Sequence, residues 1–213
     1  MGLKHSYTLL APLYDLMVEQ PTQGLRMASL SDFEQLLGHI GQPQPKVLIS
    51  GIGTGLDIPH LPREPAYVGI DLTPMMLKRA EGRIQGHNMQ LEAGDVMALP
   101  YDDNAFDAVI MHLILAVVPQ PQQALLEAER VLKPDGYIFI VDKFLRPNQK
   151  APLRRLLSPL FGQIATQTNV VFETLLAQCY GLKVIKDEPS LANGWFRRII
   201  LHKQAPQDPA AEA

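Results

Sequence analysis

The chain has 213 residues, 46% hydrophobic and 19% charged, so it can bury a sizeable core and its body is neither disordered, collagen-like nor a coiled coil. Its net charge of −3 excludes a protein that grips nucleic acid over its whole surface, and no nucleic-acid partner is predicted. The single cysteine, Cys179, can form no internal disulfide and supply no cysteine-based zinc site. With no apolar run of about 18 residues, we expect a cytoplasmic protein without a membrane span or a metal site.

The residues before position 46 predict a helical cover. Ser6–Val18 and Gly24–Gly41 have helical patterns, and Gln20–Pro21 predicts a break between them. We therefore expect two helices in front of the first strand.

From residue 46 onward, short β-rich apolar runs alternate with helical patterns, which is typical of repeated βαβ units and a mainly parallel sheet. The expected strands are Lys46–Ser50, Ala66–Ile70, Met89–Ala93, Phe106–Met111, Tyr137–Asp142, Leu182–Asp187 and Phe196–Lys203. Helices are expected at Pro74–Ile84 and Gln122–Leu132, and Lys133–Gly136 is expected to be a turn into the fifth strand.

A glycine-rich turn, GIGTG at Gly51–Gly55, directly follows the first strand. Glycine allows positive φ and lets a ligand approach the backbone. Asp71 ends the second strand, where a carboxylate can accept hydrogen bonds from both hydroxyls of a ribose. Leu56 stands where the pattern GxGxxG has its last glycine, which favours a nucleoside thioether or sulfonium over a dinucleotide. A nicotinamide-dependent oxidoreductase, which would share the turn and Asp71, is the alternative.

The end of the third strand adds a candidate for recognition of a base. The carboxylate of Asp95 can accept the exocyclic amine of adenine, and the N–H of Val96 can meet a ring nitrogen. A helix N-cap or a turn acid is the alternative role for Asp95.

Four ordered motifs resemble those of class I S-adenosylmethionine-dependent methyltransferases. They are VLISGIGTG at 47–55, YVGIDLTPMMLKRA at 67–80, LEAGDVMALPYDDNAFDAVIM at 91–111 and RVLKPDGYIFIVD at 130–142. The resemblance implies an α/β, Rossmann-like fold with a seven-stranded, mostly parallel sheet of order 3-2-1-4-5-7-6 and an antiparallel last strand. It also implies helices on both faces. We predict a single domain over 1–203, with the cover in 1–44, the cofactor-binding core in 46–142, a lid or substrate segment in 143–180 and a disordered tail in 204–213.

The resemblance implies that S-adenosyl-L-methionine is the cofactor, above the carboxyl ends of strands one to four. The residues that it assigns to the cofactor are Gly51, Gly53 and Gly55 in the glycine loop, Asp71 on the ribose, Leu72 and Met76 beside the adenosine, Asp95 and Val96 on the adenine, and His112 beside the sulfonium.

One position departs from the family. An acid usually stands two residues before the first glycine, but this chain has Ile49, so other groups must hold the amino group of the cofactor. Tyr7, Tyr14 and Asp15 are candidates, since an N-terminal Tyr-Asp element resembles the segment that folds over the cofactor in related small-molecule methyltransferases. Ordinary contacts of a capping helix are the alternative role for these residues.

Methyl transfer by in-line displacement requires a nucleophile held close and water kept out more than it requires a strong acid or base. His112 and Tyr14 are the candidate catalytic residues. His112 can act as a base toward an amine acceptor, or it can be a histidine that packs in the core or against the cofactor.

The acceptor is predicted from residues 143–172, which contain five cations and no acid beside Leu and Phe at helical spacing. This pattern is typical of a helix at an anionic membrane surface, here 143–164; a lid helix packed on its own sheet is the alternative. With LILAVVPQP at 113–121 and LAPLYDLMVE at 10–19, the segment resembles soluble bacterial phosphatidylethanolamine N-methyltransferases and, less closely, ubiquinone and menaquinone C-methyltransferases. We predict methyl transfer to a small or lipid-soluble acceptor, with preference for a phospholipid amine. Methylation of a quinone or another small molecule at carbon or oxygen, and a non-catalytic cofactor-binding protein, are the alternatives.

Overall fold

The structure is a computed structural model that describes residues 3–145 and 170–205, with side chains described from Gln20 onward except at 192 and 193. Its elements in chain order are α1 (Leu3–Leu37), β1 (Lys46–Ser50), η1 (Ile58–His60), β2 (Ala66–Asp71), α2 (Pro74–Glu81), β3 (Asn88–Ala93), β4 (Phe106–His112), α3 (Pro121–Val131), β5 (Leu132–Lys143), α5 (Phe172–Leu176), β6 (Leu182–Pro189), α6 (Leu191–Gly194) and β7 (Phe196–Lys203).

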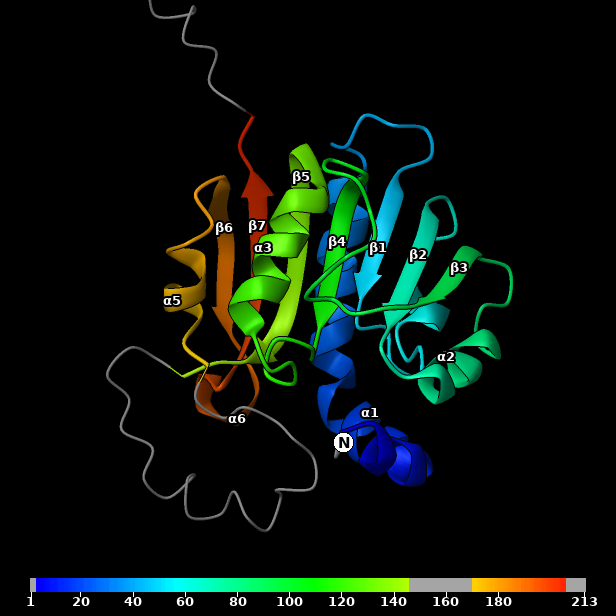
Figure 1. The fold of residues 1–213 in the computed structure, drawn as a ribbon. Coiled ribbons are helices and arrows are strands. Elements are labelled where there is room, and N and C mark those ends of the chain that lie inside the picture. The colour runs from blue at the N-terminus through cyan, green and yellow to red at the C-terminus, as the bar shows by residue number, and fades with distance from the viewer. Residues whose placement is uncertain (1–2, 146–169, 206–213) are drawn as a thin grey trace, which may run out of the picture.

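The seven strands form one sheet of order β3-β2-β1-β4-β5-β7-β6. Strands β1 to β5 pair in parallel, whereas β7 is antiparallel to both β5 and β6. Helix α1 runs behind this sheet and α3 in front of it (Figure 1). The predicted α/β fold, strand order and antiparallel last strand are confirmed.

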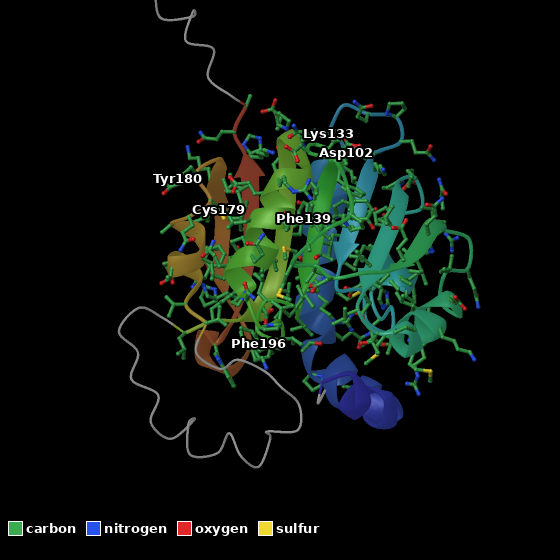
Figure 2. All side chains as sticks on the ribbon, viewed as in Figure 1. Asp102, Lys133, Phe139, Cys179, Tyr180 and Phe196 are labelled. Atoms are coloured by element: carbon green, nitrogen blue, oxygen red, sulfur yellow. The ribbon has the colours of Figure 1, made fainter. Side chains whose placement is uncertain are left out.

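Each face of the sheet carries its own hydrophobic cluster, because successive strand residues point to opposite faces. On β4, Ala108 and Ile110 belong to the cluster that contains Phe33 of α1, while Val109 and Met111 belong to the cluster on the α3 face. Every residue of β4 is buried, as expected for a central parallel strand covered on both sides. Figure 2 shows Phe139 near the middle of the sheet, where its ring meets that of Phe33 edge-on at a centroid distance of 5.3 Å.

The prediction of two N-terminal helices is wrong, since α1 continues through Gln20–Pro21 as one helix of 35 residues. Proline removes one backbone donor and often kinks a helix without ending it. In Figure 1 the N-terminal turns of α1 run at an angle to the rest of the helix.

The predicted turn at Lys133–Gly136 lies inside a strand. Strand β5 already pairs at Leu132 with Phe106 of β4, and pairing resumes at Tyr137 with Ala108, so the four residues between them form a bulge. The expected turn chemistry is present, because Asp135 has a φ of 62°. The strand therefore begins five residues earlier than predicted. The short elements η1, α5 and α6 have no counterpart in the sequence-based prediction.

The two chain segments that border residues 146–169 are joined to each other. The N–H of Leu145 donates to the carbonyl oxygen of Val170 at 2.8 Å, and Leu145 forms a parallel bridge with Val171. The guanidinium of Arg197 lies over the ring of Phe172 at 5.3 Å and also over that of Phe144. Strands β5 and β7 and helix α5 therefore fix both ends of this stretch.

Two predicted segments fall largely outside the described residues: the basic segment 143–164 beyond Leu145, and the tail 204–213 beyond residue 205. Among the residues that the structure describes, no helix combines the length and apolarity needed to cross a membrane.

Candidate active site

A cavity of about 200 Å³ opens at the carboxyl ends of β1, β2, β3 and β4. Its wall combines the loops that follow these strands with the start of α2 and one residue of α1, Arg26. The lining side chains that bear on the chemistry are Arg26, Ile49, Asp57, Asp71, Asp95 and His112. In open α/β sheets, ligands bind at this edge.

Asp71 holds the glycine loop in place. Its Oδ2 accepts the N–H of Gly53 at 2.9 Å, and its Oδ1 accepts the N–H of Thr73 at 2.9 Å. Burial raises the pKa of Asp71, and these two backbone donors counteract the rise. The side chain of Thr73 also hydrogen-bonds to Asp71. Since a carboxylate has about four acceptor sites, about one remains for another donor.

The three glycines of the loop have left-handed backbone conformations, with φ of 78° at Gly51, 57° at Gly53 and 77° at Gly55. A Cβ on Gly51 would lie 2.5 Å from Cδ1 of Ile114, whereas a Cβ on Gly53 would have no atom within 4 Å. Both residues line the cavity, so the space beside Gly53 is open to a ligand. Gly55 is not part of the lining; a Cβ there would lie 3.1 Å from Cα of Ala80 in α2, so this glycine serves the contact with that helix.

At the other end of the cavity, Met76 and Val96 are buried and Leu72 is exposed. Asp95 also lines the cavity, and its Oδ1 accepts the N–H of Met97 at 2.9 Å. This contact is the turn role considered as an alternative for Asp95, and it is compatible with a ligand contact through the remaining acceptor sites.

A buried polar network lies at the end of β4. Asp57 accepts from Nδ1 of His112 at 2.9 Å and from Arg26, while Nε2 of His112 lies 3.0 Å from the Oγ of Ser29. Arg26 also donates from Nε to Oγ1 of Thr22 at 3.2 Å. Burial alone would raise the pKa of Asp57, but His112 and Arg26 hold it at about 2, so this carboxyl is ionised at neutral pH.

Ser29, His112 and Asp57 are ordered like a hydrolytic triad, but they cannot act as one. Ser29 is only 1% exposed and does not line the cavity, so no substrate reaches its hydroxyl. Since Asp57 is ionised and can only accept, Nδ1 of His112 carries a proton, and Nε2 is directed at Ser29. The network therefore fixes His112 and attaches α1 to the turn that follows the glycine loop.

A model of the family described as "Methyltransferase domain" matches residues 48–140, which cover the glycine loop, Asp71, Asp95 and His112. A phosphatidylethanolamine N-methyltransferase of Cereibacter sphaeroides is 28% identical over 165 residues, which are 74% of this chain and 80% of that protein. These matches identify an S-adenosylmethionine-dependent methyltransferase, and its sheet has the strand order expected for the class I fold.

Other relatives of this methyltransferase include a ubiquinone/menaquinone biosynthesis C-methyltransferase, UbiE, of Roseobacter denitrificans. It is 34% identical over 151 residues, which are 67% of this chain and 59% of that protein. Among solved structures, the [4+2]-cyclase SpnF superposes with a TM-score of 0.71 and 18% identity over 95% of each chain, which reflects the shared fold.

S-adenosylmethionine is the cofactor of this methyltransferase, and the cavity fits it. Asp71 keeps an acceptor site for a ribose hydroxyl, and the open space beside Gly53 admits a ligand close to the backbone. Leu72, Met76 and Val96 offer apolar contacts for the adenine. The cavity thus brings together most of the residues predicted for the cofactor. Gly55 is an exception, because it faces α2 and does not line the cavity.

Three predicted site residues, Tyr7, Tyr14 and Asp15, lie in the N-terminal half of α1, whose side chains are outside the described residues. Cys179 is buried at the opposite end of the sheet, beside α5 and β6 (Figure 2). Burial raises the pKa of its thiol to about 12, so Cys179 is not a reactive thiolate at neutral pH.

Four residues of the network are not among those that the sequence predicts for the site: Arg26, Asp57, Thr22 and Ser29. A signal for the helical part exists, because Thr22, Arg26 and Ser29 have spacings of four and three and so share one face of α1. This face also carries the buried residues Leu30 and Phe33, so its polar side chains are expected to be buried as well. Because buried polar groups are hydrogen-bonded, they must have partners on other elements of the fold.

Proposed function

We propose that this methyltransferase methylates the amine of a phospholipid headgroup. The observation that carries the proposal is the relation to the Cereibacter sphaeroides phosphatidylethanolamine N-methyltransferase, which extends over 80% of that protein. The match to the Roseobacter denitrificans enzyme has higher identity, 34%, but extends over 59% of its length. Methylation of a quinone at carbon is therefore the second candidate.

The cavity wall supports a lipid-linked acceptor. The loop after β4 contributes Leu113, Ile114, Val117, Val118 and Pro119 to the lining. An apolar wall accommodates hydrocarbon and excludes water from the reacting groups. When bound, S-adenosylmethionine supplies an electrophilic methyl group on its sulfonium.

We infer that the residues of this chain contribute mainly by position. Asp71 and the glycine loop orient the cofactor, and the loop after β4 keeps water out. His112 positions the network, because both of its ring nitrogens already have partners in Asp57 and Ser29. The roles predicted for Tyr14 and Tyr7, in closing the site over cofactor and acceptor, stay proposals.

The test uses purified protein and S-adenosylmethionine labelled with tritium in the methyl group. Vesicles that contain phosphatidylethanolamine and detergent micelles that contain demethylmenaquinone are assayed in parallel, and the lipid extracts are separated by thin-layer chromatography. Label in N-methylated phosphatidylethanolamine alone is the expected result. Label in the quinone alone would refute methylation of a phospholipid amine and support methylation of a quinone at carbon.

We also propose that residues 143–164 bring the enzyme to anionic membranes, which would present a lipid acceptor to the site. The sequence of the segment supports this, with Arg154 and Arg155 among its cations and leucines between them. Sedimentation with liposomes that contain phosphatidylglycerol should weaken in the variant Arg154→Glu with Arg155→Glu, while binding of S-adenosylhomocysteine stays unchanged. Unchanged sedimentation would assign the segment to the lid alternative.

A further inference from the structure

The cavity has no acid on β1 where the family usually has one. Ile49 lines the cavity there and is buried in the hydrophobic cluster on the α1 face. An aliphatic side chain cannot accept a hydrogen bond from the α-ammonium of the cofactor. The amino-acid end of S-adenosylmethionine carries this ammonium and a carboxylate, so it requires one anionic and one cationic partner.

The same cavity contains one such pair, contributed by two other elements. Arg26 comes from α1 and Asp57 from the turn before η1; they form an ion pair, and both line the cavity together with Ile49. Their side chains are only 4% and 12% exposed, so both charges have lost most of their water. Burying an ion pair gains little stability by itself, and the position of this pair in the cavity wall points to a ligand.

We propose that Asp57 and Arg26 hold the amino-acid end of S-adenosylmethionine, in place of the acid missing at position 49. Asp57 accepts the α-ammonium, and Arg26 donates to the α-carboxylate.

Both side chains have capacity for these contacts. Within the part of the chain that the structure describes, each oxygen of Asp57 has one partner, Arg26 on Oδ1 and His112 on Oδ2, whereas a carboxylate has about four acceptor sites. Among the described residues, Arg26 donates from Nε to Thr22 and from Nη1 to Asp57, whereas a guanidinium has five N–H donors. His112, whose other ring nitrogen contacts Ser29, holds Oδ2 of Asp57.

This assignment makes α1 part of the cofactor site. The cofactor would contact Arg26 directly, so its amino-acid end would bridge the helical cover and the loop after β1. The proposal depends on the cofactor alone and not on the identity of the acceptor.

The test compares two ligands by calorimetry without any acceptor: S-adenosylhomocysteine, which has the amino-acid end, and methylthioadenosine, which lacks it. In Asp57→Asn, we expect the affinity for S-adenosylhomocysteine to fall about tenfold or more, because a charge-assisted contact is lost. The affinity for methylthioadenosine should change less than about twofold, since it makes no such contact. Equal losses for both ligands, or no loss for either, would overturn the proposal.

Asp32→Asn is the matched control, because Asp32 also attaches α1 to the body of the fold, through Lys186 and Arg198 on β6 and β7, but does not line the cavity. It should leave both affinities unchanged; a loss specific to S-adenosylhomocysteine in this variant would show that docking of α1 alone explains the effect.

The double variant Ile49→Glu with Asp57→Asn should recover affinity for S-adenosylhomocysteine, and failure to recover it in a folded protein would count against the relocation of the acid. If Asp57→Asn does not fold, Arg26→Lys keeps the charge of the pair. The same selective loss is then expected, and an unchanged ratio of the two affinities would refute the proposal.

Discussion

Alanine at Gly53 tests whether the open space beside the glycine loop is where the cofactor lies. The left-handed backbone costs a non-glycine residue about 1–2 kcal/mol, and no atom within 4 Å adds a clash. We expect the melting temperature of Gly53→Ala to fall by about 2–8 °C, because about 1 kcal/mol corresponds to about 2–4 °C at this chain length. The new methyl group occupies space next to the backbone, so calorimetric affinity for S-adenosylhomocysteine should fall about tenfold or more.

Gly51→Ala is the matched comparison. It has the same backbone cost, and its Cβ would also lie 2.5 Å from Cδ1 and 2.6 Å from Cγ1 of Ile114, which adds about 1–3 kcal/mol of overpacking. This variant should therefore lose more stability than Gly53→Ala. If Gly53→Ala binds S-adenosylhomocysteine as tightly as the wild type, the space beside Gly53 faces solvent and the assignment of the cofactor to this side of the loop is wrong.

Three further predictions concern the carboxylate of Asp71, the dependence of stability on pH, and the packing of α1. In Asp71→Asn, one carboxylate oxygen becomes an amide NH2 that faces a backbone N–H donor, so the free energy of unfolding in urea should fall by about 1–3 kcal/mol. The affinity for S-adenosylhomocysteine should fall about tenfold. An unchanged affinity would contradict the predicted contact between Asp71 and the ribose. Burial raises the pKa of Asp142 from 3.8 to about 6, so its contribution to stability is complete below pH 3.8 and is lost as the pH rises through 6. Urea unfolding between pH 4 and 7 should show a decline of about 2 kcal/mol in the wild type that Asp142→Asn lacks, and parallel profiles of the two proteins would refute this contribution of Asp142. Phe33→Ala removes a fully buried ring and should cost about 3–5 kcal/mol, whereas Met27→Ala, at a position 37% exposed on the same helix, should cost less than about 1 kcal/mol; similar losses in both would contradict the packing of α1.

The sequence predicts the sheet well because central parallel strands are continuous apolar runs bounded by turns. Lys46–Ser50 and Phe196–Lys203 have the same bounds in prediction and structure. The start of β5 was predicted late, since Pro134 and Gly136 indicate a turn and only the pairing of Leu132 with Phe106 shows that the strand has already begun. A break is predicted at Gln20–Pro21 because a proline usually ends a helical pattern. Whether a helix continues through a proline depends on tertiary packing, which the sequence pattern does not contain.

Gly51, Gly53 and Asp71 could be predicted to lie together because short motifs at the ends of neighbouring parallel strands carry them, and the structure places them in one cavity. The polar network was missed because its partners are distant in the chain: His112 lies 55 residues from Asp57 and 83 from Ser29. Spacing along a sequence indicates neighbours on one helix or one strand, and it does not indicate which helix packs against which strand end. The departure at Ile49 indicated that another group is needed, and only the fold identifies Arg26 and Asp57 as the groups beside it.

The bridge between Leu145 and Val171 places the two junctions that border residues 146–169 side by side. Because the hydrogen bond between Leu145 and Val170 already brings the two junctions together, a replacement segment needs to satisfy only this short span. Chimeras that carry the corresponding stretch of a quinone or a phospholipid methyltransferase can therefore be built on one constant cofactor-binding core. Such a series would measure how far selectivity between methyl acceptors depends on the 24 exchanged residues, while the sheet and the glycine loop stay unchanged.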